Sequence, residues 1–368
     1  MRAVADSALI VGGGPAGAAA AIAIAGAGRG VTVIERNAGP TDKVCGDFLS
    51  TEAISAIGGL GVALPAVAQI TSLRLVHGTR SATVQLPFTA AGITRRALDE
   101  ALLQRAAASG ATVLRGYSAH RVSQLDGLLR VDCGQLGQLS AGSVFLATGK
   151  HELRGAARAS RGTGLIGMKM YYTLAPAQIA ELRNHVELVL FNGGYAGLQL
   201  VESERAVLCI LLPASRLRAA DGRWDRLMQS LISECPQLGA RLAGADAALE
   251  RPLTVAGLPY GFIHAASPGD PPGLFRVGDQ AAVIPSLTGD GVALALSSGT
   301  LAARTWLQHG NVARRYHRGN AALITRQMRI ATAIHGLCRR DSMQAWVVAA
   351  CRLWPGAMRL AAGWTRLR

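Results

Sequence analysis

The feature that most constrains this chain is a glycine-rich turn between an apolar strand and an apolar helix near the N-terminus. Residues 9–17 read Leu-Ile-Val-Gly-Gly-Gly-Pro-Ala-Gly, and Glu35 follows eighteen residues after the last glycine, at the end of a second apolar run. Gly12 permits a tight turn, Gly14 lets a phosphate approach the backbone, and Gly17 lets the helix pack close to the strand. The N–H groups at the helix start can face a diphosphate, and Glu35 can accept a hydrogen bond from a ribose. The pattern predicts a β-α-β unit that binds an adenine dinucleotide.

The charge balance of the chain narrows the classes of partner. The 368 residues include 38 Lys and Arg against 23 Asp and Glu, which gives a net charge of +15. Such a balance favours anionic partners. No zinc-finger or RNA-binding signature is present, so we predict no nucleic-acid partner. Six scattered cysteines without a CxxC pair predict neither a metal site nor a disulfide framework, as is typical of the cytoplasm.

The uncharged run 7–28 is long enough to suggest a membrane span or a signal segment. Both interpretations are rejected, because the sequence Gly-Gly-Gly-Pro at 12–15 would break a membrane helix in its middle. These glycines also stand where a phosphate-binding turn needs them.

The rest of the chain alternates strand and helix patterns without repeats or linkers. The patterns predict a hairpin at 73–86, a helix from Thr94 to Gly110, an apolar strand at 143–149, strands within 163–212, a helix at 224–235, a short strand at 274–279, a helix from about Val292, and basic helices from Asn311 onward. A dinucleotide domain interleaved with a β-rich domain follows from this order.

Three spaced segments together resemble one family. They are the glycine turn with Glu35-Arg36, the segment Arg95-Arg96-Ala97-Leu98-Asp99, and 274–282 with Pro285 and Thr288-Gly289-Asp290-Gly291. Over roughly residues 7–310 the chain is similar to FAD-dependent oxidoreductases of the para-hydroxybenzoate hydroxylase fold. The loop Lys43-Val44-Cys45-Gly46-Asp47 resembles the Cys-Gly loop of the geranylgeranyl reductase-like branch. The segment 192–198 resembles the strand that faces the substrate cavity in that branch.

The resemblance implies an α/β fold: a Rossmann-like FAD-binding domain of the GR2 type, interleaved with a mixed β-sheet substrate domain and followed by C-terminal helices. The implied FAD-binding domain comprises 1–72, 94–160 and 270–310, the substrate domain 73–93 and 161–269, and the helical segment 311–368. The implied FAD-binding residues are Gly12, Gly14, Pro15, Ala16, Gly17, Glu35, Arg36, Cys45, Gly46, Arg95, Thr148, Gly149, Gly278, Asp279, Gly289, Asp290, Gly291 and Val292.

Within this set, Asp279 is expected to accept hydrogen bonds from ribityl hydroxyls, and Arg95 to contact the phosphates or the ribityl chain. The backbone N–H groups of Gly291 and Val292 are expected to face the flavin C2 carbonyl, where they would stabilise negative charge.

One departure from the aromatic hydroxylases of this fold concerns the electron donor. The third strand is followed by Ala-Thr-Gly at 147–149 and then by Lys150-His151, where the hydroxylases have Gly-Ala-Asp-Gly. The Ala-Thr-Gly turn still suits FAD, but the missing Asp leaves NAD(P)H and a protein donor as alternatives. Lys150 and His151 are more typical of solvated loop residues than of proton or phosphate sites.

The chemistry remains open between two reactions on a small apolar substrate, such as an isoprenoid, a polyketide or a phenolic lipid. One is hydride delivery from the reduced flavin N5 to a C=C bond. The other is hydroxylation of an aromatic ring through a C4a-hydroperoxide. The catalytic candidates are Cys45 and Tyr195. Cys45 is equally typical of a small residue that fills a turn, and Tyr195 of an ordinary aromatic residue in a strand. A prenyl- or lipid-binding carrier without redox chemistry is the alternative of another class.

The C-terminal segment carries Trp346, Trp354 and Trp364 among the arginines 339, 340, 352, 359, 366 and 368. This composition predicts either a basic amphipathic helix pair that contacts an anionic membrane surface or a cap on the substrate domain. A lipid-like substrate favours the membrane contact.

Overall fold

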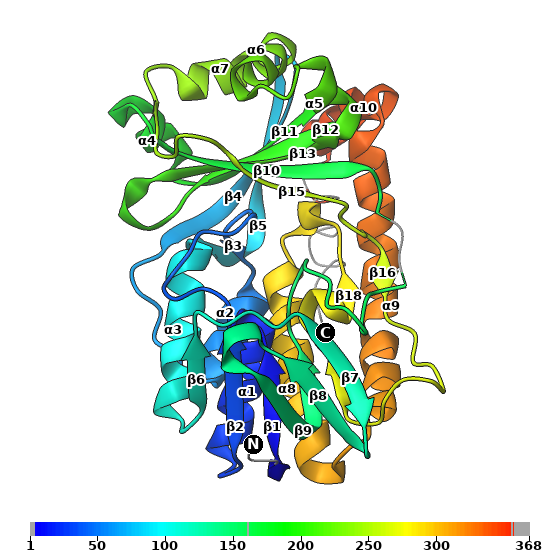
Figure 1. Cartoon of the computed structure of the whole chain (residues 1–368). Helices are drawn as coiled ribbons and strands as arrows, with labels where there is room; N and C mark the ends of the chain where they lie inside the picture. The colour runs from blue at the N-terminus through cyan, green and yellow to red at the C-terminus, as the bar shows by residue number, and fades with distance from the viewer. Residues whose placement is uncertain (1–3, 160–161, 355, 357–368) are drawn as a thin grey trace.

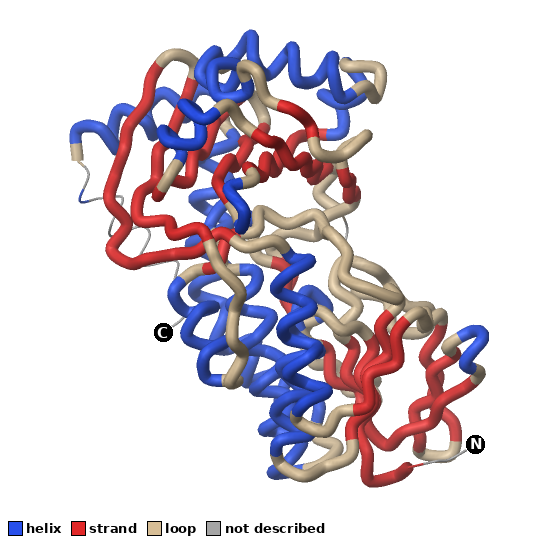
Figure 2. Tube along the Cα trace, turned by 90° about the vertical axis from the view of Figure 1, so that its left-hand side faces the viewer, coloured by secondary structure: helices blue, strands red, loops and turns tan. Residues whose placement is uncertain are grey.

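A computed structural model, which describes residues 4–159, 162–354 and 356, places two mixed sheets one above the other (Figures 1 and 2). The lower, seven-stranded sheet has the order β6-β2-β1-β9-β8-β7, with β17 beside β9. Its strands are β1 (Val4–Val11), β2 (Val31–Glu35), β6 (Thr112–Arg115), β7 (Arg121–Leu125), β8 (Leu128–Asp132), β9 (Gln138–Leu146) and β17 (Leu274–Arg276).

The strand β9 joins two kinds of pairing in the lower sheet. Its first half, up to Ala141, runs antiparallel to β8, whereas Val144–Leu146 lie parallel to β17. The same strand is parallel to β1 on its other edge. The five strands β6, β2, β1, β9 and β17 are therefore all parallel, and their carboxyl ends meet at one edge of the sheet, where ligands bind in open α/β sheets.

The upper, nine-stranded sheet has the order β14-β10-β13-β12-β11-β4-β5-β3, with β15 beside β10, and a separate pair is formed by β16 and β18. These strands are β3 (Phe48–Leu49), β4 (Ala68–His77), β5 (Arg80–Gly92), β10 (Leu165–Thr173), β11 (Asn184–Phe191), β12 (Gly194–Leu200), β13 (Ala206–Pro213), β14 (Asp246–Ala247), β15 (Leu253–Ala256), β16 (Phe262–Ile263) and β18 (Ala282–Val283).

Most helices cover one sheet, whereas α9 runs along both and α2 packs on β3 and β5 as well as on α8 (Figure 1). They are α1 (Pro15–Gly26), α2 (Thr51–Gly59), α3 (Arg95–Ala108), α4 (Pro176–Leu182), α5 (Ala214–Ala219), α6 (Trp224–Glu234), α7 (Pro236–Leu242), α8 (Gly291–His309), α9 (Ala313–Arg339) and α10 (Asp341–Leu353). The helix α1 is almost wholly buried, since small Ala side chains let it pack between the lower sheet and the helices α3 and α8.

The predicted α/β class and the order of elements are confirmed, and the uncharged run 7–28 forms the end of β1, the glycine turn and α1. In the part of the chain that the structure describes, no helix is long and apolar enough to cross a membrane.

One predicted boundary needs correction. The boundary between 72 and 73 cuts through β4, which is one strand from Ala68 to His77. The strands predicted within 163–212 are confirmed as β10 to β13, and the short helix α4, which Pro176 starts, lies between β10 and β11. The helices predicted from 311 are present among the described residues as α9 and α10, and α9 packs on β17 below and on β11 and β12 above.

Candidate functional site

The glycine turn packs against the turn that follows β9. Gly12 has a φ of +109°, and a Cβ there would lie 2.3 Å from the Ala147 carbonyl oxygen. A Cβ on Gly17 would lie 2.0 Å from the Gly12 oxygen. Side chains are therefore excluded at both positions, and the start of α1, where no described side chain caps the helix, remains available to an anion.

Glu35 is buried at the carboxyl end of β2 and ties that strand to the turn. Its Oε2 accepts a hydrogen bond from the Gly13 N–H at 2.8 Å, and its Oε1 accepts from the backbone and side-chain amides of Asn37 at 3.0 and 2.6 Å. The carboxylate is held in one orientation beside the turn, while its neighbour Arg36 is exposed.

Arg95 reaches the same turn from the first residue of α3. Its Nε and Nη2 donate to the two Asp99 carboxylate oxygens at 2.8 and 2.9 Å, and a Cβ on Gly14 would lie 3.5 Å from Nη2. Lys43 donates to the same carboxylate at 2.7 Å. Burial opposes the ionised form of Asp99, but Arg95 and Lys43 hold its pKa below the usual value. The guanidinium is thereby fixed beside the predicted phosphate position.

The loop 43–47 is anchored to the upper sheet by a buried ion pair. The Lys169 ammonium on β10 donates to Asp47 Oδ2 at 2.6 Å, and both side chains are 0% exposed. The Tyr171 hydroxyl donates to the same oxygen at 2.6 Å, and Gln199 on β12 donates to the Asp47 carbonyl at 2.9 Å. Burial raises the pKa of Asp47 and Lys169 opposes that rise. The loop that carries Cys45 is therefore held by two strands of the upper sheet, β10 and β12.

Lys150 corrects one expectation from the sequence. Instead of being a solvated loop residue, it is half-buried and donates from Nζ to the Val44 carbonyl at 2.9 Å. The neighbouring turn is closed by Thr148, which donates to the His151 carbonyl at 2.7 Å, and by Gln280, which donates to the Gly149 carbonyl at 2.9 Å. His151 itself is exposed.

The downstream segment 278–292 runs from the carboxyl end of β17 to the start of α8. The Gly278 N–H donates to Ser298 Oγ at 2.9 Å, and the Asp279 carbonyl accepts from Arg158 at 2.8 Å. The Asp279 side chain is half-buried. Asp290 is buried at the N-cap of α8, and Gly291 is exposed.

A cluster of two tyrosines, a serine and a histidine lies beside this segment. Ser286 is hydrogen-bonded to the Tyr195 hydroxyl at 2.6 Å and to the Tyr260 hydroxyl at 2.9 Å. The His335 ring meets both tyrosine rings edge-on, with centroids 6.0 and 5.6 Å apart. We call Tyr195, Tyr260, Ser286 and His335 the hydroxyl cluster.

The hydroxyl cluster adjoins two residues of the predicted site. Burial raises the pKa of Tyr260, and the groups that add to the rise include Cys209, Asp279 and Cys45. Burial also raises the pKa of Tyr195 well above its usual value. Tyr195 is thus a member of the hydroxyl cluster, and the charged forms of Cys45 and Asp279 act electrostatically on the Tyr260 phenol.

Several residues of this site were missed by the sequence analysis, namely Asp47, Lys169, Tyr171, Gln199, Tyr260, Ser286 and His335. One signal was available: Lys169 is the only charged residue in the apolar strand Leu165–Thr173, and a buried ammonium requires a partner. The hydroxyl cluster offers no comparable signal, because its members come from separate elements.

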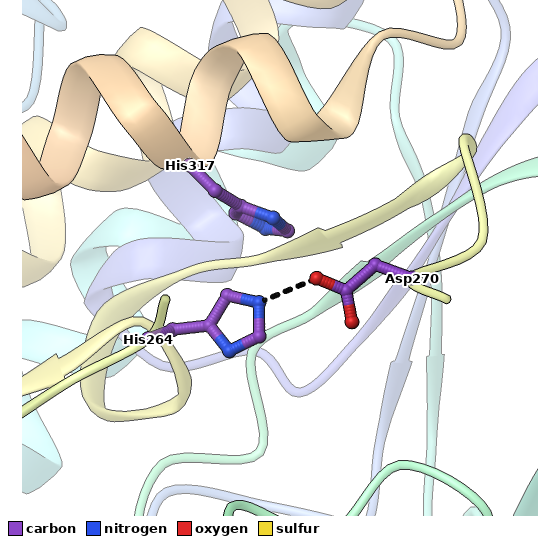
Figure 3. Close-up of side chains that lie close together, drawn as sticks. All are labelled: His264, Asp270 and His317. Atoms are coloured by element: carbon purple, nitrogen blue, oxygen red, sulfur yellow. Dashed lines mark hydrogen bonds and ion pairs between the residues drawn. The ribbon is translucent and has the colours of Figure 1, made fainter. Parts of the chain in front are cut away.

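Two histidines and an aspartate lie close to one another beside β17 (Figure 3). His264 Nε2 lies 3.1 Å from Asp270 Oδ2, and one ligand atom from each of His264, Asp270 and His317 lies within 4.8 Å of the others. However, His317 Nε2 accepts a hydrogen bond from the Arg276 N–H at 3.0 Å, and burial lowers the pKa of His317 to about 3. The neutral ring therefore carries its proton on Nδ1, which disfavours a metal ion there.

The backbone positions named above suit an extended dinucleotide. At Gly46, Gly149 and Gly291 an added Cβ would meet nothing within 4 Å, in contrast to Gly12 and Gly17. These three open positions belong to the loop 43–47, the turn after β9 and the start of α8. We call these three positions, the start of α1 and Arg95 the cradle; its open backbone and the basic charge at the glycine turn are what a bound FAD would need.

Comparison with known proteins gives the class. Residues 6–127 match the model of the FAD binding domain family. With the fold and the cradle, this match defines the protein as a FAD-dependent oxidoreductase, as the resemblance predicted. Its curated relatives include the menaquinone reductase of Mycolicibacterium smegmatis, which is 27% identical over 324 residues, 82% of this chain and 76% of the relative. The menaquinone reductase of Mycobacterium tuberculosis is 29% identical over 321 residues, with the same coverage.

Solved structures share the fold at lower identity. The flavin-dependent brominase Bmp2 superposes with a TM-score of 0.80 at 15% identity, covering 98% of this chain and 94% of that one. A geranylgeranyl bacteriochlorophyll reductase-like protein of Thermoplasma acidophilum superposes with a TM-score of 0.75 at 17% identity, covering 99% and 100%. At these identities the likeness concerns the fold.

Proposed function

We propose that this protein reduces an isoprenoid quinone or a closely related apolar substrate, and that it belongs with the reductases of its fold rather than the hydroxylases. The observation that carries the proposal is the similarity to menaquinone reductases, which extends over 82% of the chain and so includes the upper sheet as well as the FAD-binding sheet. When bound, FAD supplies the hydride.

The residues around the hydroxyl cluster support an apolar substrate. Tyr195 packs among buried apolar side chains, which include Leu190, Leu211 and Leu258. Ser286 holds the Tyr195 and Tyr260 hydroxyls, and burial keeps both phenols protonated at neutral pH. Reduction by hydride requires a proton for the neighbouring atom, and we assign its delivery to these hydroxyls.

The roles of the other site residues form part of the same proposal. Glu35 is assigned to the ribose of FAD, Arg95 to its diphosphate and Asp279 to its ribityl chain. Cys45 lines the same region without a base that would activate its thiol. The electron donor is proposed to be NAD(P)H or a reduced protein.

The first experiment measures the reaction itself. The yellow holoenzyme is reduced with dithionite without oxygen and mixed with menaquinone, and flavin reoxidation is followed at its visible absorption band. The recovered substrate is analysed by mass spectrometry before and after exposure to air. A gain of two hydrogens that persists in air identifies a reduced side-chain double bond, whereas a gain that air reverses identifies the quinol. Oxygen consumption in proportion to a hydroxylated product would instead establish a monooxygenase.

Variants then assign the proton donor. We expect Tyr195→Phe and Tyr260→Phe to slow reoxidation by about tenfold to a hundredfold while flavin content stays unchanged. Tyr172→Phe is the matched control, because Tyr172 is buried on the same sheet but packs in a different cluster. Equal rates in all three variants would remove the tyrosines from the mechanism. A protein that contains no flavin, or flavin that menaquinone does not reoxidise, would contradict the proposed function.

A further inference from the structure

Exposed apolar side chains are concentrated at α10. Of the six large hydrophobic side chains that are exposed among the described residues, four lie between 337 and 354. Trp346 is 72% exposed, Leu353 85% and Trp354 68%. Trp346, Ala350 and Leu353 follow one another at helical spacing on one face of α10. We call these three residues and Trp354 the α10 patch.

The opposite face of α10 is firmly packed, so the α10 patch has a rigid support. Gln344, Val348 and Cys351 are buried on that face. The Gln344 amide donates to the Phe191 carbonyl at 2.7 Å and to the Cys338 carbonyl at 2.9 Å. The helix therefore has two apolar faces: one packs on the upper sheet at β5 and β4, where Figure 1 shows α10, and the other is exposed.

The charge around the α10 patch is predominantly positive. Arg340 precedes α10 and Arg352 lies near its end; both are exposed, and neither forms an ion pair with a described residue. From 313 to 353 the chain has Asp341 as its single acidic residue against eight arginines, at 314, 315, 318, 326, 329, 339, 340 and 352. Exposed indoles next to arginine are typical of helices that lie in a lipid interface, where the rings enter the headgroup region and the cations bind lipid phosphates.

The inner face of α10 connects the α10 patch to the proposed active site. Val348 and Cys351 belong to the same apolar cluster as Tyr195, and Tyr260 packs against that cluster. A single helix thickness thus separates the exposed patch from the hydroxyl cluster. A substrate dissolved in a bilayer would reach the site next to the element that contacts the bilayer.

We propose that the α10 patch, with Arg340 and Arg352, docks the protein on the surface of an anionic lipid bilayer, so that an apolar substrate enters beside α10. The entry step rests on the proposed function, whereas the docking itself is independent of turnover. The occupant is a lipid surface rather than a second copy of the chain, because a second copy would bring the same uncompensated arginines into opposition.

The test is sedimentation of the full-length holoenzyme with vesicles of phosphatidylcholine alone and with 30% phosphatidylglycerol, about 30% being a usual anionic fraction for such assays. We expect binding to the anionic vesicles that weakens as salt rises, with a blue shift of tryptophan fluorescence. R340Q/R352Q should lower partitioning about 25-fold, since each arginine near an anionic surface contributes about fivefold. Trp346→Gln with Leu353→Gln should lower it by about tenfold or more.

Matched controls separate docking from general charge and folding. R121Q/R304Q removes two positive charges, as R340Q/R352Q does, but from exposed positions on β7 and α8. Leu323→Gln removes an exposed apolar side chain from α9. Both should bind vesicles as the parent protein does. The docking variants should keep their flavin and their rate with a detergent-dispersed quinone.

Three results would overturn the docking proposal. The first is that the parent protein does not bind anionic vesicles. The second is that the control variants lose as much vesicle binding as the docking variants. The third is that the protein forms a concentration-dependent dimer that Trp346→Gln abolishes. If vesicle binding is lost in the docking variants while quinone reduction is absent throughout, docking stands and the proposed function fails.

Discussion

The buried pair of Asp47 and Lys169 offers the sharpest test of how the two sheets are joined. The ammonium lies 2.6 Å from the carboxylate and both side chains are 0% exposed. Lys169→Met keeps the length of the apolar stem and removes the charge. It leaves a buried carboxylate whose remaining donors are the Tyr171 hydroxyl and the Arg95 N–H. Breaking such a pair from one side costs about 3–5 kcal/mol.

The assay is urea unfolding at pH 7 followed by circular dichroism and by flavin release. We expect Lys169→Met to lower the free energy of unfolding by about 3–5 kcal/mol, and Asp47→Asn in the same chain to recover part of that loss because no buried charge remains. Arg183→Met, which breaks the pair with Glu204 in which the two side chains are 58% and 55% exposed, should cost at most about 1 kcal/mol.

The stability loss of Lys169→Met should depend on pH, in a direction set by the pKa of Asp47. In Lys169→Met the uncompensated burial places the folded-state pKa of Asp47 above its unfolded value, so stability is lost as pH rises through the folded pKa. The deficit relative to the parent protein should therefore be smaller at pH 5 than at pH 8. A single variant that loses less than about 1 kcal/mol, or a double variant as unstable as the single one, would refute the reasoning.

Three further predictions concern the cradle and the buried histidines. Gly12→Ala should abolish flavin binding, because its Cβ would lie 2.3 Å from the Ala147 oxygen, whereas Gly26→Ala, with nothing within 4 Å, should keep the flavin-to-protein ratio. Burial lowers the pKa of His317 to about 3 and of His335 to about 4, so the unfolded state binds more protons below about pH 6.5. The free energy of unfolding should therefore fall with decreasing pH by up to about 1.4 kcal/mol per pH unit for each histidine. His335→Leu should remove one such contribution. If the slope of the unfolding free energy against pH, measured by urea titration, is the same in His335→Leu as in the parent, this reasoning is wrong. Adding Co²⁺ should produce no ligand-field absorption at the two-histidine cluster, since its buried ring presents an N–H group; a tetrahedral cobalt spectrum would disprove that tautomer.

The sequence alone determined the parts of the protein that depend on local pattern. The glycine turn, the acid after the second strand and the capped helix that starts at Arg95 could be recognised because their function requires fixed spacings along the chain. The Gly-Asp turn at 278–279 could be recognised for the same reason. These segments predicted the class of fold and FAD, which the comparisons confirm.

Only the tertiary structure decided which residues far apart in the sequence contact one another. Asp47 meets Lys169 across 122 residues and Tyr195 meets Ser286 across 91, and in each pair one partner lies on the nine-stranded sheet and the other on a loop or turn packed against it. It also decided that α10 buries one apolar face and exposes the other, which a helical period cannot distinguish when both faces are apolar. A pattern along the chain reports which side chains prefer burial or a phosphate. Which buried groups become neighbours depends on sheet order and helix packing, and these arise only when distant segments compete for the same core.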